Sequence, residues 1–116
     1  MLRTCALAFA LHLALTVAAL AQSYVAGIED LPLMPGLVEQ EGAGLVFDKP
    51  EGRIVEAVAS GTGRAQAVAD YYAKVLPQLG WQRVADGNYT RESERLVIAA
   101  REDGARVTVQ FTLSPN

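Results

Sequence analysis

The chain has 116 residues, with 10 Lys and Arg against 13 Asp and Glu, so its formal net charge of -3 offers no basic excess for binding a phosphate backbone. Its only cysteine is Cys5 and its only histidine is His12. Beyond these two positions the chain cannot form a disulfide framework, a Ser-His-Asp or Cys-His catalytic arrangement, or a zinc site of thiolates and imidazoles.

Residues 1–21 predict a cleaved export signal, with a positive start at Arg3, an apolar run over 5–20 and the cleavage motif Ala19-Leu20-Ala21. The alternative is an uncleaved anchor, which needs about 20 strongly apolar residues. The run here is shorter and rich in alanine, and its cysteine stands at its start rather than after it, so no lipid-carrying cysteine stands at the cleavage point. We therefore expect a mature chain of residues 22–116, periplasmic or secreted, with no stable membrane insertion.

Residues 22–44 form a Pro- and Gly-containing lead-in. Pro32 and Pro35 disfavour a helix. The segment also carries too many large apolar residues for a free linker, namely Ile28, Leu31, Leu33, Met34 and Leu37. We expect an extended strap packed on the core of the chain's own domain at residues 45–116, and a strap that packs on a partner is the alternative.

Six strands are predicted in three hairpins. They cover 45–48 with 53–59, 81–85 with 88–91, and 95–101 with 105–113. The first turn has Pro50 and Gly52 at favoured turn positions, and Asp86-Gly87 is a strong two-residue hairpin signal. In the third hairpin, loop residues Asp103-Gly104 would place Arg101 opposite Arg106.

A helix is predicted from Arg64 to Leu79, with Thr62 as its N-cap. Its apolar stripe consists of Ala65, Val68, Tyr72, Val75, Leu76 and Leu79. Pro77 should tighten the last turn, and Gly80 suits the left-handed position that ends a helix. The amide of the next residue should then bond back into the last turn. These features predict a structural latch formed by Tyr72, Leu76, Gly80 and Trp81.

The third hairpin sorts its side chains onto two faces. One face is apolar and should receive the helix. The other face is a possible interaction surface made of Arg95, Arg101, Arg106, Thr108, Gln110 and Thr112. Arginine is enriched at protein interfaces, whereas a solvated sheet face is the alternative interpretation.

Three short motifs could carry chemistry. The stretch 60–64, Ser-Gly-Thr-Gly-Arg, could cradle phosphate at a helix start, but it lacks the third glycine of a dinucleotide site, and an ordinary strand-to-helix connection is the alternative. Glu92 and Glu94 could act as a carboxylate pair or belong to a solvated turn. The run 102–104, Glu-Asp-Gly, has too few oxygen ligands for a calcium loop. We therefore expect no catalytic, cofactor or metal residue.

The opening Pro32-Leu33-Met34-Pro35-Gly36 and the run 71–81, Tyr-Tyr-Ala-Lys-Val-Leu-Pro-Gln-Leu-Gly-Trp, follow one another in a familiar order. They resemble a group of small exported bacterial domains of uncharacterised function, with a P-x-x-P-G opening and a Y-Y-x-x-x-L-x-x-x-G-W core. The resemblance spans residues 30–113. It implies an α+β fold and a location in the cell envelope, with no catalytic residue to transfer.

These observations together predict an α+β fold, with one helix packed on a mostly antiparallel, meandering sheet of five or six strands. The expected function is a non-enzymatic module that binds another cell-envelope protein, with no cofactor and no nucleic acid. One alternative is a small-ligand or lipid binder with its site between helix and sheet. The other is a carboxylate-based hydrolase.

Overall fold

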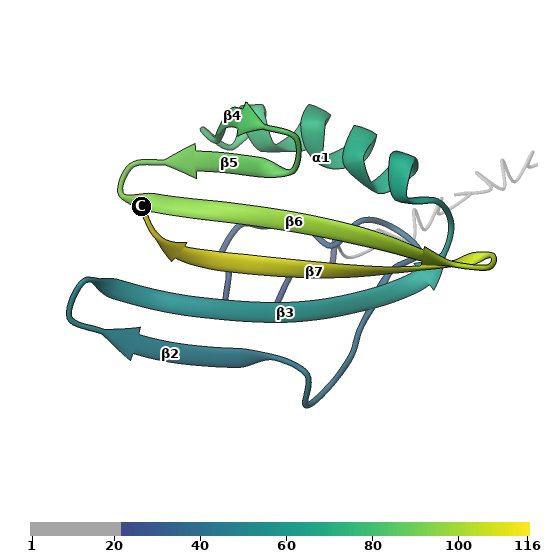
Figure 1. The fold of residues 1–116 in the computed structure, drawn as a ribbon, viewed down its shortest axis with the longest axis horizontal. Coiled ribbons are helices and arrows are strands. Elements are labelled where there is room, and N and C mark those ends of the chain that lie inside the picture. The colour runs from purple at the N-terminus through teal and green to yellow at the C-terminus, as the bar shows by residue number, and fades with distance from the viewer. Residues whose placement is uncertain (1–21) are drawn as a thin grey trace, which may run out of the picture.

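Residues 22–116 are described by this computed structural model, and the predicted export signal at 1–21 lies outside them. The structure has one helix and an antiparallel sheet of seven strands. Figure 1 shows the helix beside the sheet. The elements are β1 Val38–Glu39, β2 Leu45–Lys49, β3 Gly52–Thr62, α1 Ala65–Gln78, β4 Gln82–Ala85, β5 Asn88–Arg91, β6 Glu94–Asp103 and β7 Arg106–Pro115. Among residues 22–116, α1 is too short and too polar to cross a membrane.

The strands lie in the order β1-β3-β7-β6-β5-β4, and β2 pairs with the same side of β3 as β1 does. After α1 the chain crosses to the far edge of the sheet and meanders back, so β7 ends between β3 and β6 (Figure 1). The predicted α+β class and antiparallel sheet are confirmed. The predicted count of five or six strands is wrong, because the lead-in adds the two-residue strand β1, which is too short to show any periodicity.

The third hairpin has a different register from the predicted one. Asp103 pairs with Arg106 and Arg101 with Thr108, so the loop residues are Gly104 and Ala105. Gly104 has a φ of 61°, which suits the first central position of a two-residue hairpin turn. The shift is two residues, the period of the pleat, and the predicted sorting onto two faces therefore survives.

The end of α1 is built as the latch predicts. The Trp81 amide donates to the Leu76 carbonyl at 3.0 Å, and Gly80 has a φ of 88°. The predicted cap at the other end is wrong, because the N-cap position is Arg64 and no side chain of its own segment caps the helix. The carboxylate of Glu102 on β6 instead accepts from the Ala65 amide at 2.8 Å.

The core lies on one face of the sheet, beneath both α1 and the lead-in. The lead-in contributes six buried side chains, Val25, Ile28, Leu31, Pro32, Leu33 and Leu37. The Tyr72 hydroxyl fixes the lead-in to α1, because it donates to the Pro32 carbonyl at 2.9 Å and accepts from the Met34 amide at 3.1 Å. The ring of Tyr72 also contacts Phe111 of β7, so helix, lead-in and sheet share one core.

Candidate functional site

The opposite face of the sheet is covered by no element of residues 22–116, and we call it the open face. It carries all six residues of the predicted interaction surface. Thr108, Gln110 and Thr112 follow one another along β7 at its centre. Arg101 lies opposite Thr108 near one end, close to Arg106, whereas Arg95 lies at the other end. The structure therefore brings the six residues into one continuous row, with Arg95 next to Thr112 at one end and Arg101 and Arg106 at the other.

An apolar border lies beside these polar residues, and the sequence interpretation did not identify it. Leu45 and Phe47 of β2 point to the open face and are 50% and 53% exposed. Phe47 lies opposite Ile54, which is half-buried. The signal was present in the run Leu45-Val46-Phe47, because three consecutive apolar residues in a strand cannot all face one core.

The arginines differ between the two sides of the molecule. Each arginine at the covered side has a carboxylate partner: Arg53 with Glu94, Arg64 with Glu102, Arg83 with Asp86 and Arg91 with Asp30. Within residues 22–116, no carboxylate lies within ion-pair distance of Arg95, Arg101 or Arg106. Only Arg106 bonds another side chain, the Ser60 hydroxyl at 3.4 Å. Glu56 and Asp103 also lie on this face, but neither forms an ion pair with these arginines, so the open face presents three arginines that are free of ion pairs within residues 22–116.

The predicted latch is closed by Arg91, which the sequence interpretation did not single out. Its guanidinium lies 4.4 Å from the centre of the Trp81 ring, donates to the Leu79 carbonyl at 2.9 Å and pairs with Asp30 at 2.8 Å. It therefore ties the lead-in to the end of α1.

Burial raises the pKa of the Tyr72 hydroxyl above its usual range, so this side chain stays neutral and hydrogen-bonded at neutral pH.

The glycine-rich stretch 60–64 serves the packing of the lead-in. A Cβ atom at Gly61 would collide with the carbonyl oxygen of Gly36, so only glycine lets the two backbones lie this close. The helix start that could hold phosphate already receives the Glu102 carboxylate. Of the proposed carboxylate pair, Glu94 pairs with Arg53 at 3.7 Å, and Glu92 lies exposed in the β5–β6 turn.

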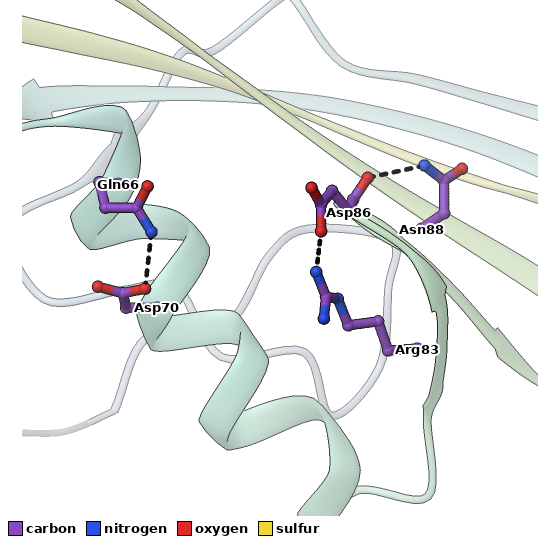
Figure 2. A network of polar contacts seen from close by, with 5 residues as sticks. All are labelled: Gln66, Asp70, Arg83, Asp86 and Asn88. Atoms are coloured by element: carbon purple, nitrogen blue, oxygen red, sulfur yellow. Dashed lines mark hydrogen bonds and ion pairs between the residues drawn. The ribbon is translucent and has the colours of Figure 1, made fainter.

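A cleft of about 490 Å³ opens between α1 and the β4–β5 hairpin. Its lining is mixed, with apolar side chains that include Val68, Tyr72, Tyr89 and Ile98 and polar ones at the rim. Figure 2 shows polar residues from the two elements facing each other, with Gln66 bonded to Asp70 on the helix and Arg83 paired with Asp86 on the hairpin. The cleft could take a small, mainly apolar molecule with a polar end.

No group of three or more metal-ligating side chains occurs within residues 22–116. No family model, no curated protein and no solved structure matches the chain. The arguments for function therefore come from the residues and their geometry alone.

Proposed function

We propose that this chain is a non-enzymatic module of the bacterial cell envelope, periplasmic or secreted, and that it binds another envelope protein through the open face. The observation that supports this most is the position of the two covering elements. The helix and the lead-in pack on the same face of the sheet, so the opposite face is left to solvent with its arginines unpaired by carboxylates.

The chemistry of the open face suits a protein partner. Arginine, hydroxyl and amide side chains provide hydrogen-bond donors across the strands, and the apolar border at Leu45 and Phe47 provides surface that gains from losing water. Because the arginines lack carboxylate partners, an acidic surface of the partner could pair with them without breaking an existing ion pair.

Photo-crosslinking in intact cells tests the proposal. A photoreactive residue at Gln110 lies at the centre of the open face, and one at Lys74 is the matched control on the exposed side of α1. A crosslinked product with another protein from position 110 and none from position 74 supports the proposal. The double variant Arg95→Glu and Arg101→Glu should abolish that product without loss of fold. Recovery of self-crosslinks alone, or of nothing, contradicts it.

The cleft supports a second candidate function, the binding of a small apolar ligand or lipid. Native mass spectrometry of protein purified from its own host would show the added mass of a carried ligand. Ala69→Phe should remove that mass by filling the cleft, whereas Ala67→Phe, an exposed helix position that does not line the cleft, should retain it. Protein that carries no added mass would contradict this candidate.

A further inference from the structure

The edge strands β2 and β4 are protected to different degrees. On β4 the register shifts between Arg83 and Ala85, and α1 lies alongside. Bulges and covering elements of this kind keep an edge from pairing with other chains. On β2 all five residues pair with β3 in unbroken register, none is buried, and the strand begins with three exposed apolar residues. The β2 edge is therefore an unblocked template for another strand.

The free backbone groups on β2 can be identified from the hydrogen bonds. The Gln40 amide donates to the Val58 carbonyl at 2.8 Å, so even-numbered residues of β3 direct their backbone groups toward β1 and β2. In the β2–β3 register, these even-numbered residues of β3 lie opposite odd-numbered residues of β2, such as Leu45 and Phe47. Backbone groups alternate in direction along a strand, so those of Val46 and Asp48 point away from the sheet. Within residues 22–116, no strand pairs with β2 on this side.

We propose that a second copy of this chain pairs with β2 in antiparallel orientation, about a two-fold axis perpendicular to the sheet at Val46. This axis places Val46 opposite Val46 of the second copy, in position to exchange two backbone hydrogen bonds. The same axis places Leu45 of each copy opposite Phe47 of the other copy. Three apolar cross-strand pairs result, and apolar pairs of this kind stabilise antiparallel sheets.

Self-complementarity favours a second copy as the occupant. At the Val46 axis, Asp48 lies opposite Gly44, where no side chain opposes the carboxylate. An axis at Phe47 would place Val46 opposite Asp48 and Leu45 opposite Lys49. An axis at Asp48 would bring two carboxylates together. Of these three axes, the Val46 axis alone gives every apolar residue of β2 an apolar partner.

Such a dimer would extend the sheet across both copies, with the two open faces on the same side. Its contact is confined to one short strand and the adjoining turn, which is smaller than a stable dimer interface requires. We expect a dissociation constant on the order of 10–100 µM. Two copies bound to one partner surface would then bind more tightly than either copy alone.

Sedimentation velocity from about 1 to 500 µM, a range that brackets the expected dissociation constant, tests the dimer directly. The full chain should move from monomer to dimer across this range. Val46→Lys places two cations at the axis and should weaken association at least tenfold. Val84→Lys is the matched control, because Val84 on β4 has the same exposed fraction of 60%. A monomer at every concentration would overturn the proposal, as would equal effects of the two variants.

Cysteine crosslinking tests the register independently. In a Cys5→Ser background, Val46→Cys would carry the only thiol, and diamide should join two copies, since opposed residues about 5.5 Å apart permit a disulfide. Val84→Cys should stay monomeric. Equal crosslinking at position 84, or stronger crosslinking from Phe47→Cys, would overturn the Val46 axis. A crosslink from Gln110 to another protein together with a monomeric chain here would overturn only the dimer and leave the proposed function standing.

Discussion

The two faces of the sheet differ in their environment, although the same strands form both. The covered face holds Val55, Phe111 and Leu113 at 0%, 0% and 1% exposure beneath α1 and the lead-in. The open face alternates with it residue by residue and keeps its arginines in water. Neighbouring positions in one strand therefore differ in what they do: one stabilises the fold, and the next remains free for contact with another molecule.

The largest expected difference lies between two adjacent residues of β7. Phe111→Ala removes a fully buried ring that contacts Tyr72, and should lower the free energy of unfolding by about 3–5 kcal/mol. Gln110→Ala on the open face should change it by less than about 0.5 kcal/mol. Urea denaturation of both variants measures the two values. Similar losses would mean that the open face is buried in solution.

A smaller effect is expected from Gly61→Ala, which adds a single carbon on the covered face. Because that carbon would collide with the Gly36 carbonyl, the lead-in must move away from β3, at a cost of roughly 1–3 kcal/mol. Amide hydrogen exchange should show faster exchange over residues 31–37. Gly104→Ala is not a suitable control, because its left-handed backbone adds strain of its own. Ala99→Gly on the open face is the better comparison, and it should leave exchange in the lead-in unchanged.

Tyr72→Phe should cost roughly 1–3 kcal/mol, because it leaves the Met34 amide without its acceptor. The pKa of Tyr72 is raised in the folded state, so above pH about 10 the unfolded chain loses this proton first. Stability is therefore fully present below that pH and falls as the pH rises further. Urea midpoints at pH 8 and pH 11 measure the fall, which should be smaller in Tyr72→Phe. An equal fall in both proteins would assign it to other groups.

The smallest difference is expected between two arginines. Arg91→Ala loses a partly shielded ion pair, a bond to the Leu79 carbonyl and the contact with Trp81, and should cost about 1–2 kcal/mol. Arg101→Ala should leave stability within about 0.5 kcal/mol and affect only binding. Thermal unfolding of the two variants compares them. A destabilised Arg101→Ala would show that this side chain has a partner within the fold.

Local sequence signals predicted the elements that depend only on residues near one another in sequence. The stripe that includes Tyr72 and Leu76, and the Gly80 that ends it, lie within one helix and its last turn. The two-face sorting of the third hairpin was also predictable, since an error of two residues leaves every side chain on its own face. The six interaction-surface residues could be placed on one face for the same reason.

Features that depend on contacts between distant residues could not be predicted. Arg91 meets Asp30 across 61 positions of sequence, and Glu102 caps a helix that begins 37 positions before it. Neither spacing follows any helical or strand period. Predicting the open face would have required knowing that the lead-in and α1 cover the same side of the sheet, and no sequence periodicity indicates this.

The position of β7 has a consequence for when this protein can fold. The strands before α1 and the strands β4, β5 and β6 form two groups that only β7 joins, and β7 is the latest of the seven in sequence. Because its pairing with β3 joins residues far apart in sequence, such as Val55 and Leu113, folding should be slow compared with that of helical proteins of this size. A nascent chain cannot complete its sheet until residues 106–115 have left the ribosome. Under the proposed export, such a delay would keep the polypeptide unfolded, the form that a narrow translocation channel requires.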